Sequence, residues 1–371
     1  MKIAISGGHL TPALAIIAEL KKRGIENVFY IGRARSMEGD QAPSAESAVI
    51  PSLKIKFYSI SVGRLQRKFT KHTIPSLLRS PMGVISSILI LGQEKPDVVI
   101  SFGSYVALPV VIAAWILGIP SITHEQTVQG GLANKLISKL VKKIALAWPD
   151  VDNNFPSEKT VVTGNPIRLE ILNLKKKRTN RPVIFVTGGN QGAHSINEAI
   201  MEVIEPLLEK YEVVHQTGSS EKFKDFEMLG ARVSQLPSRL KNRYKLAKWV
   251  NSEELADIYK EASIIVGRSG ANTVSEAAAL GIPAIFIPLP WAGAKEQEKN
   301  AKMLSDLGAA IVLSQERLTP KRLLAAINSM VEKLDIYKKE AKKAKKLINP
   351  NAAKLFVDEA LKLISTTKNE L

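Results

Sequence analysis

Residues 267–276 read Gly267-Arg268-Ser269-Gly270-Ala271-Asn272-Thr273-Val274-Ser275-Glu276, and this stretch decides how the rest of the chain is interpreted. The apolar run 263–266 before it predicts a buried strand, and residues 274–280 predict a helix that Gly281 ends. A second apolar run, 284–287, predicts the next strand. A helix that begins just after Gly270 presents backbone N–H groups and the positive end of its dipole, which suits a phosphate.

Glu276 has two interpretations. It is expected about a turn and a half inside the helix, where a carboxylate could accept hydrogen bonds from both hydroxyls of a ribose. However, Thr273-x-x-Glu276 also matches a capping box, in which the glutamate only closes its own helix start. The ten residues alone leave both interpretations open.

Composition sets limits on the class of protein. A chain of 371 residues predicts two domains, and 45% hydrophobic with 23% charged residues is typical of a soluble globular protein. No cysteine is present, which excludes disulfides and thiolate metal sites. With 52 Lys and Arg against 35 Asp and Glu, the net charge of +17 predicts an anionic partner, such as nucleic acid, acidic lipid headgroups or a phosphorylated substrate.

The sequence predicts a cytoplasmic protein that is peripheral to a membrane. The N-terminus lacks the long apolar region of a signal peptide, and the apolar stretch 105–120 is short and contains Pro109, so it predicts a buried helix. A basic loop at 63–71 precedes an apolar, helix-compatible segment at 74–91. These residues predict either a loop and a core helix or a surface that lies on an anionic bilayer.

The first half of the chain predicts a parallel sheet. A strand at 3–5, a glycine turn, a helix capped by Thr11-Pro12 and a strand at 28–31 form a βαβ unit. No complete G-x-G-x-x-G is present and no acidic residue follows the second strand, which disfavours a nicotinamide cofactor. Three predicted strand ends carry Gly8-His9, Gly103-Ser104 and His124-Glu125, so we expect these residues to converge on one edge of the sheet.

The second half repeats this order. After a charged, proline-closed segment at 175–182, a strand at 183–186, a glycine turn at 187–193 and a helix at 196–208 are predicted. A short strand is expected at 247–250, and the lysine run 338–346 is interpreted as a solvated helix face. We therefore expect two doubly wound α/β domains that face each other across a cleft.

Eight motifs in order extend the argument to nearly the whole chain. They are Gly7-Gly8-His9 with Pro12, Ser36-Met37-Glu38, Phe102-Gly103-Ser104-Tyr105, His124-Glu125-Gln126, Gly164-Asn165-Pro166-x-Arg168, Gly188-Gly189-x-Gln191-Gly192-Ala193, Arg268-Ser269-Gly270-Ala271 through Glu276, and Gln297-x-x-Asn300-Ala301. Together they resemble the MurG family, glycosyltransferases that move N-acetylglucosamine from UDP-GlcNAc onto a polyprenyl-diphosphate-linked sugar, lipid I, in peptidoglycan synthesis.

The resemblance implies a GT-B fold of two Rossmann-like domains. It divides the chain into an acceptor-binding domain at 1–164, a linker at 165–182, a UDP-sugar-binding domain at 183–349, and a last helix at 350–371 that returns to the first domain. The implied donor-binding residues are Arg168, Gly189, Asn190, Gln191, Gly192, Val250, Ser269, Gly270, Ala271, Asn272, Thr273, Glu276 and Gln297. The implied acceptor-binding residues are Gly7, Gly8, His9, Ser104, Tyr105 and Thr127. Thr127 and Asn190 stand where the family commonly has Asn and Ser.

The implied reaction is inverting, with direct displacement at the anomeric carbon. The residue types agree with it, because a helix N-terminus can stabilise departing UDP and His9 suits a general base near neutral pH, with Glu125 as the second candidate. No Asp-x-Asp pair occurs among the motifs, so no cofactor and no protein-bound metal is expected.

Three other functions are compatible with parts of the sequence. A UDP-GlcNAc 2-epimerase shares the GT-B architecture but needs no lipid acceptor, which the basic and apolar segment 64–91 disfavours. A transferase with a diacylglycerol acceptor is a second alternative. A nucleic-acid-binding protein is suggested only by the net charge, and no recognised nucleic-acid motif accompanies it.

Overall fold

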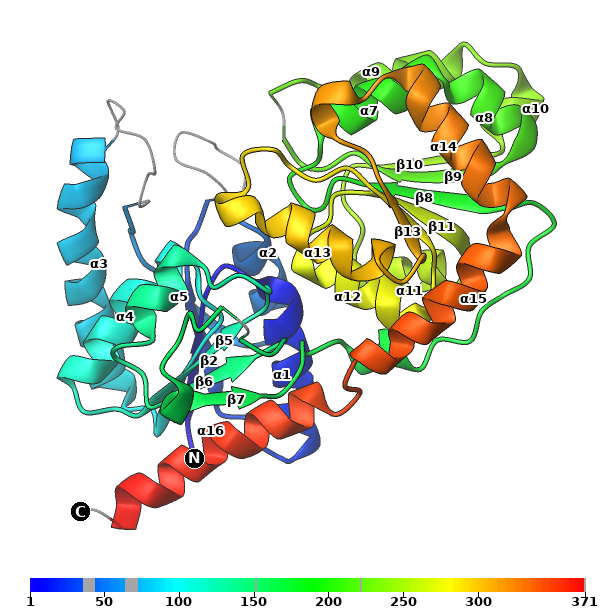
Figure 1. Cartoon of the computed structure of the whole chain (residues 1–371). Coiled ribbons are helices and arrows are strands. Elements are labelled where there is room, and N and C mark those ends of the chain that lie inside the picture. Colours follow the sequence, from blue (N-terminus) through cyan, green and yellow to red (C-terminus); the bar gives the residue numbers. More distant parts are fainter. Residues whose placement is uncertain (36–43, 64–72, 151, 221, 370–371) are drawn as a thin grey trace. The chain divides into compact units, whose positions relative to one another are not determined.

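The protein consists of two compact α/β units. The computed structural model describes residues 1–35, 44–63, 73–150, 152–220 and 222–369 (Figure 1). Unit 1 comprises residues 1–168 and 349–371, and unit 2 comprises residues 169–348. Residues 64–71 of the predicted basic loop and the motif Ser36-Met37-Glu38 lie outside the described residues, whereas the other seven motifs lie within them.

Unit 1 is built on a seven-stranded parallel sheet of order β3-β2-β1-β4-β5-β6-β7. Its elements are β1 (Ile3–Ser6), α1 (Leu10–Lys22), β2 (Val28–Gly32), α2 (Ala45–Ser52), β3 (Lys56–Ser59), α3 (Thr73–Glu94), β4 (Val98–Ser101), α4 (Ser104–Ile116), β5 (Ser121–Glu125), α5 (Leu132–Ile137), β6 (Lys143–Leu146), β7 (Thr160–Val162) and α16 (Ala352–Asn369). Every paired strand is parallel, and β1 lies between β2 and β4 as in a doubly wound sheet.

The two faces of this sheet are covered by different helices. Ile3 and Ile5 of β1 pack in a cluster with α1 and α16, whereas Ala4 packs in a second cluster with α3 and α4 (Figure 1). Successive side chains of a strand point to opposite faces, so a strand covered on both faces must be apolar throughout. The short apolar runs in the sequence, such as those of β1 and β4, meet this requirement.

Unit 2 is built on a six-stranded parallel sheet of order β10-β9-β8-β11-β12-β13. Its main elements are α6 (Leu169–Leu172), β8 (Val183–Thr187), α7 (His194–Glu202), α8 (Ile204–Lys210), β9 (Glu212–Gln216), α9 (Asp225–Ser234), α10 (Ser238–Lys241), β10 (Tyr244–Ala247), α11 (Ser252–Glu261), β11 (Ala262–Gly267), α12 (Ala271–Leu280), β12 (Ala284–Phe286), α13 (Glu296–Ser305), β13 (Ala310–Val312), α14 (Pro320–Glu332) and α15 (Leu334–Ala344). The predicted class, two doubly wound α/β domains, is confirmed.

Several local predictions are wrong. α1 begins at Leu10 with His9 at its N-cap, so Thr11 is already helical and no side chain caps this start. Residues 248–250 follow β10 instead of forming a strand. The helix expected at 196–208 is two helices, α7 and α8.

The predicted linker, residues 165–182, makes several contacts with unit 2. Ile171 of α6 is fully buried, and the Lys176 ammonium donates hydrogen bonds to the carbonyls of Tyr259 and Ala262. Residues 169–182 of the predicted linker group with unit 2, and residues 165–168 group with unit 1. Because charged residues usually face solvent, the sequence of this segment did not indicate these contacts.

Candidate active site

The ends of three neighbouring strands of unit 1 bring the predicted acceptor and catalytic residues together. β1 pairs with β4, and β4 pairs with β5, so Gly8-His9, Gly103-Ser104 and His124-Glu125 share one sheet edge, as predicted. The first two turns pack closely. A Cβ on Gly8 would lie 2.9 Å from Ser104 Cβ, so only glycine permits this approach.

The turn after β4 holds a strained backbone. Gly103 has φ +64° and Ser104 has φ +68°, a conformation that is uncommon for a residue other than glycine. The next residue, Tyr105, accepts a hydrogen bond through its hydroxyl from Arg33, which also pairs with Glu46 at 3.1 Å. These contacts fix the tyrosine beside the turn.

Glu125 is buried and fully engaged. Its Oε1 accepts hydrogen bonds from the backbone N–H and hydroxyl of Thr127, at 3.0 and 2.7 Å. Its Oε2 accepts from the Gly131 N–H and the Asn134 amide, both at 2.9 Å. The position of the Glu125 carboxylate is therefore fixed by backbone and side-chain donors. Thr127, which was predicted to bind the acceptor, thus donates hydrogen bonds to Glu125.

His9 lies half-buried at the start of α1. Burial lowers its pKa, the charge of Glu125 opposes this effect, and the Arg33 guanidinium lowers the pKa further. His9 is therefore neutral at neutral pH, as a proton acceptor must be. The neighbouring His124 is fully buried, its Nε2 lies 3.1 Å from the Gly164 carbonyl oxygen, and burial lowers its pKa to about 4.

In unit 2, the predicted phosphate site has the expected backbone. α12 begins at Ala271 with Gly270 at the N-cap, and no side chain caps this start. The first N–H groups of a helix have no partner within it, and residues 271–273 are only half-buried. Apart from its chain neighbours, no atom lies within 4 Å of a Cβ built on Gly270, so the N-cap of α12 is not crowded. This combination is typical of an anion site.

Glu276 does not form a capping box. The residue at the N-cap is Gly270, and Thr273 is already inside α12. Glu276 is buried, and its Oε2 accepts a 2.8 Å hydrogen bond from the Tyr259 hydroxyl. The capping-box interpretation is therefore wrong, and the carboxylate is held in place by another helix, α11.

The second glycine turn packs tightly against the end of β9. Gly192 has φ +84°, and a Cβ there would lie 2.0 Å from the Thr217 carbonyl oxygen. Gly189 also has a positive φ, +76°, but faces open space. Asn190 and Gln191 at the tip are exposed. The turn is thus held by close packing at Gly192 and is accessible to solvent at Asn190 and Gln191.

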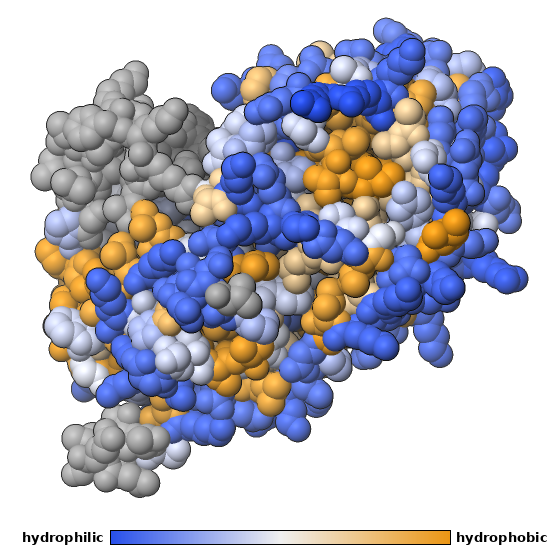
Figure 2. Space-filling view, in the orientation of Figure 1, coloured by the Kyte–Doolittle hydropathy of each residue, from blue (hydrophilic) through white to orange (hydrophobic). Residues whose placement is uncertain are grey.

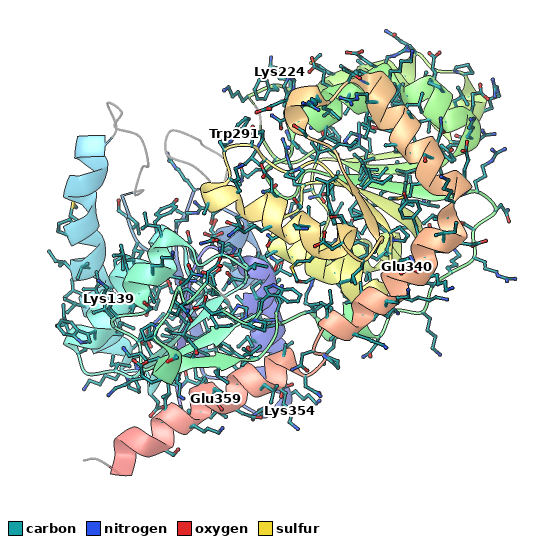
Figure 3. The ribbon with its side chains drawn as sticks, viewed as in Figure 1. Lys139, Lys224, Trp291, Glu340, Lys354 and Glu359 are labelled. Carbon is teal, nitrogen blue, oxygen red and sulfur yellow. The ribbon has the colours of Figure 1, made fainter. Side chains whose placement is uncertain are left out.

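The remaining predicted donor residues occupy different places. Ser269 is buried and donates a 2.7 Å hydrogen bond to the backbone of Gln297, whose side-chain oxygen accepts from the Leu289 N–H. Val250 is buried in the loop before α11, in unit 2. Arg168 is buried at the end of unit 1. Trp291, labelled in Figure 3, is 72% exposed in the loop between β12 and α13.

Three positioning residues were missed in the sequence: Tyr259, which holds Glu276; Asn134, which holds Glu125; and Arg33, which holds Tyr105. Each lies on a different element from the residue it holds, so no local motif contains the pair. The strand order could have suggested only that the elements are neighbours.

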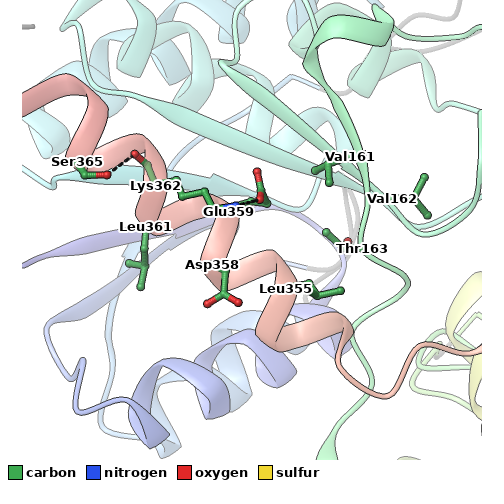
Figure 4. A pocket seen from close by; sticks show the side chains of 9 residues that line it. All are labelled: Val161, Val162, Thr163, Leu355, Asp358, Glu359, Leu361, Lys362 and Ser365. Atoms are coloured by element: carbon green, nitrogen blue, oxygen red, sulfur yellow. Dashed lines mark hydrogen bonds and ion pairs between the residues drawn. The ribbon is translucent and has the colours of Figure 1, made fainter. Parts of the chain in front are cut away.

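Unit 1 also contains a cavity away from the candidate acceptor residues. A cavity of about 530 Å³ lies between β7 and α16 of unit 1, lined by Leu355, Asp358 and Val162 among others (Figure 4). Within the part of the chain that the structure describes, no three or more His, Asp or Glu side chains form a group that could hold a metal ion.

The chain matches known protein families over most of its length. Residues 6–146 match the glycosyltransferase family 28 N-terminal domain, and residues 183–356 match the glycosyltransferase family 28 C-terminal domain. A solved structure, Acinetobacter baumannii MurG, superposes with a TM-score of 0.69 and 29% identity, covering 98% of this chain and 100% of that chain. UDP-GlcNAc 2-epimerase from Neisseria meningitidis superposes with a TM-score of 0.65 over 98% of this chain and all of that one, but its 17% identity shows a common fold alone.

Two curated relatives of the chain carry the same name. The UDP-N-acetylglucosamine–N-acetylmuramyl-(pentapeptide) pyrophosphoryl-undecaprenol N-acetylglucosamine transferase of Bacillus subtilis (strain 168) is 34% identical, over 95% of this chain and 97% of the relative. The protein of that name from Listeria welshimeri is 36% identical, over 97% and 99%. The chain therefore belongs to glycosyltransferase family 28 and, within it, to the MurG family of N-acetylglucosamine transferases.

Proposed function

We propose that this enzyme transfers N-acetylglucosamine from UDP-GlcNAc to N-acetylmuramyl-(pentapeptide) pyrophosphoryl-undecaprenol, with inversion at the anomeric carbon. The observation that carries the proposal is the similarity to transferases of that name, which extends over 95% of the chain at 34% identity. The donor and acceptor residues inferred from the sequence agree with this activity.

For the donor, the start of α12 supplies the phosphate contacts. The N–H groups of residues 271–273 and the helix dipole stabilise the diphosphate as negative charge develops on departing UDP. Glu276, held by Tyr259, accepts hydrogen bonds from the ribose hydroxyls. The exposed tip at Asn190-Gln191 and the amide of Gln297 add contacts to the phosphates and the sugar.

For the acceptor, His9 acts as the general base. Its lowered pKa keeps the imidazole neutral, so it can take the proton from the acceptor hydroxyl while the oxygen of that hydroxyl attacks the anomeric carbon. Glu125 acts through its charge: its four hydrogen bonds hold it, and its field opposes the effect of burial on the His9 pKa. The Gly7-Gly8 turn and Ser104 line the acceptor phosphate. No metal is required by this scheme.

We further propose that unit 1 binds an anionic membrane surface through α3 and α4. Large apolar side chains are exposed on both helices, including Leu89 at 67% and Trp115 at 60%, and Figure 2 shows hydrophobic residues gathered over these helices. No helix among the described residues is long and apolar enough to cross a bilayer. An apolar patch on a chain of charge +17 suits a surface of anionic lipid.

The transfer reaction is tested by incubating the protein with radiolabelled UDP-GlcNAc, with and without the undecaprenol-linked acceptor in detergent. Label in the lipid together with acceptor-dependent UDP release supports the proposal. Acceptor-independent release of UDP together with ManNAc would instead identify an epimerase. Sedimentation with phosphatidylglycerol vesicles tests the membrane surface: Leu89→Glu with Trp115→Glu should abolish binding that the unaltered protein shows.

A further inference from the structure

Unit 2 contains a cavity at the opposite edge of its sheet from the predicted donor residues. Its volume is about 460 Å³, and it is lined by residues 176–182, which lead into β8, by residues 261–263 and 280–283 at the starts of β11 and β12, and by α15. The donor residues follow the carboxyl ends of β8 and β11, whereas this cavity lies at the amino ends. We call it the basal cavity.

Positive charge dominates the lining of the basal cavity. Its cationic residues are Lys176, Lys177, Arg178, Arg181, Lys338, Lys342 and Lys345. Glu261 is the one acidic residue among those that line it, and it pairs with Lys177 at 2.7 Å. Six cationic side chains thus share the lining without a carboxylate from the lining as partner. Like charges gathered around one concave space raise the local potential and attract anions.

The lysines of α15 and of the 3-10 turn that follows it at residues 345–347 lie on two different faces of this segment. Lys338, Lys342 and Lys345 follow at intervals of four and three residues, which places them on one face, and all three line the cavity. Lys339, Lys343 and Lys346 do not line it, although they are as exposed as Lys342 and Lys345.

Glu340, labelled in Figure 3, pairs with Lys343 at 2.6 Å and so compensates a lysine away from the cavity. Within the described ranges, no ion pair joins Lys338, Lys342 or Lys345 to a carboxylate. The solvated-face interpretation of this lysine run agrees with the exposure of Lys342 and Lys345, which line the cavity and also face solvent.

Lys176 is fixed at the edge of the cavity. Its ammonium donates hydrogen bonds of 2.8 and 2.5 Å to the carbonyls of Tyr259 and Ala262, at the C-terminal end of α11. Burial, with the charges of Lys338 and Lys345, lowers its pKa to about 8. The charges of Lys338 and Lys345 add to the larger effect of burial, and an anion placed among these cations would raise the Lys176 pKa again.

The other side of the lining is apolar. Leu280, Ile282, Pro283 and Leu334 contribute to it, and the aliphatic part of Lys345 lies against Gly281, where a Cβ would be 2.9 Å from Lys345 Cε. The volume falls within the range of small-molecule sites, roughly 300–1,000 Å³. A space of this size, with several cations and an apolar wall, fits one or more phosphate groups attached to a small organic body.

We propose that the basal cavity is a second anion-binding site, which takes a phosphate-bearing ligand between residues 176–178 and the three lining lysines Lys338, Lys342 and Lys345. Phosphate is the shared chemistry of two sources, a free phosphorylated molecule and a phospholipid headgroup. The inference does not rest on the proposed transfer reaction, because none of the residues that carry it belongs to the predicted donor or acceptor site.

The test compares two triple variants of the full chain. The inner variant carries Lys338→Gln, Lys342→Gln and Lys345→Gln. The outer variant carries Lys339→Gln, Lys343→Gln and Lys346→Gln, which removes the same charge from the same segment. Both are first compared with the unaltered protein by circular dichroism and thermal unfolding, and a single Lys342→Gln protein replaces the inner variant if the latter fails to fold.

Two binding measurements distinguish the sources. Calorimetric titration with tripolyphosphate, in excess UDP to occupy the predicted donor site, reports a free ligand. Sedimentation with phosphatidylglycerol vesicles, compared with phosphatidylcholine vesicles, reports a headgroup. In one of the two, the inner variant should bind about tenfold more weakly or worse, because it loses three positive charges that line the cavity, while the outer variant should bind as the unaltered protein does.

A difference in the titration identifies a free phosphorylated ligand, and a difference in sedimentation identifies a phospholipid headgroup. Equal weakening in both variants would mean that only overall charge matters, and it would overturn the proposal. Absence of any difference in both arms would overturn it as well. Neither result depends on whether the protein transfers N-acetylglucosamine, because no substrate turnover is measured.

Discussion

The Tyr259 hydroxyl donates a 2.8 Å hydrogen bond to Oε2 of Glu276, and both side chains are buried. The tyrosine lies on α11 and the glutamate on α12, so the bond joins two helices that flank β11. The Tyr259 ring also packs edge-on against Phe185 of β8, with 5.6 Å between ring centroids. The orientation of the carboxylate proposed to hold the ribose is therefore set by the packing of three elements.

Removal of this hydroxyl should weaken donor binding. In Tyr259→Phe, the KM for UDP-GlcNAc should rise about tenfold with little change in kcat, because a hydrogen bond to a charged group contributes roughly 1.5–3 kcal/mol. Steady-state kinetics at varied donor concentration measure the effect. Tyr211→Phe is the matched control, since its hydroxyl bonds Asn328 in the same unit at 2.7 Å. An equal rise of KM in both variants, or in neither, would contradict the orienting role.

Loss of the proposed base should affect turnover more than binding. His9→Ala should lower kcat by about 10²- to 10⁴-fold, the usual contribution of a general base, while the KM for the donor stays close to that of the unaltered enzyme. The assay follows label entering the lipid acceptor. An unchanged kcat in a folded His9→Ala protein would show that His9 is not the base.

The pH dependence follows from the lowered pKa of His9. The base must be neutral, so activity is retained above its pKa and is lost as the pH falls through it. The acid limb of kcat/KM should therefore have its midpoint below 6.5. Glu125 raises this pKa, so Glu125→Gln should move the midpoint to still lower pH. A midpoint that moves upward in Glu125→Gln would contradict this electrostatic account.

The backbone of both candidate sites was predictable from the sequence, and the partners of their side chains were not. Glycines at 7, 8, 188 and 192 mark turns because their conformations or close contacts exclude other residues, and apolar runs fix the strands between them. The Tyr259–Glu276 contact depends on how two helices pack on a sheet. No spacing along the chain encodes that packing.

The differences between the predicted and observed helices, strands and connecting segments have similar causes. Thr11-Pro12 is a good capping pair, yet tertiary packing starts α1 at Leu10. The charged segment 175–182 looked like a linker because lysine usually faces solvent, whereas Lys176 bonds the C-terminal carbonyls of α11. The edge strand β7 has three residues, and nothing in its sequence distinguished it from a loop.

Two glycines of one turn should respond differently to the same substitution. Gly189 and Gly192 both have positive φ, but a Cβ would meet nothing within 4 Å at Gly189 and the Thr217 carbonyl oxygen at 2.0 Å at Gly192. Gly189→Ala should cost only backbone strain, roughly 1–2 kcal/mol, and Gly192→Ala should cost clearly more because the backbone must also move. Urea denaturation measures both. Equal losses of unfolding free energy would show that the close packing of this turn is unimportant.

His215 should make the stability of unit 2 depend on pH. It is fully buried, its Nδ1 lies 2.7 Å from the Tyr244 hydroxyl, and its Nε2 lies 3.0 Å from Oδ1 of Asn197. The Asn197 amide nitrogen donates to the Thr217 carbonyl, so its oxygen accepts. Hence Nε2 carries the proton and Nδ1 accepts from the tyrosine, and a second proton on the ring would require the Tyr244 hydroxyl to give up this donated hydrogen bond and accept instead.

Burial lowers the pKa of His215 to about 3, whereas an unfolded histidine titrates near 6.5. Above pH 6.5 both states are neutral; as the pH falls from 6.5 towards 3, the unfolded state binds a proton that the folded state cannot, and stability is lost by about 1.4 kcal/mol per pH unit. In His215→Gln this contribution is absent. The variant should be less stable at pH 7, because Tyr244 and Asn197 lose a well-placed partner, but its unfolding free energy should fall less steeply between pH 6 and 5. Urea denaturation at these pH values measures the slopes, and His124, which is present in both proteins, contributes equally to each. Parallel slopes would mean that His215 is already able to bind a proton in the folded state.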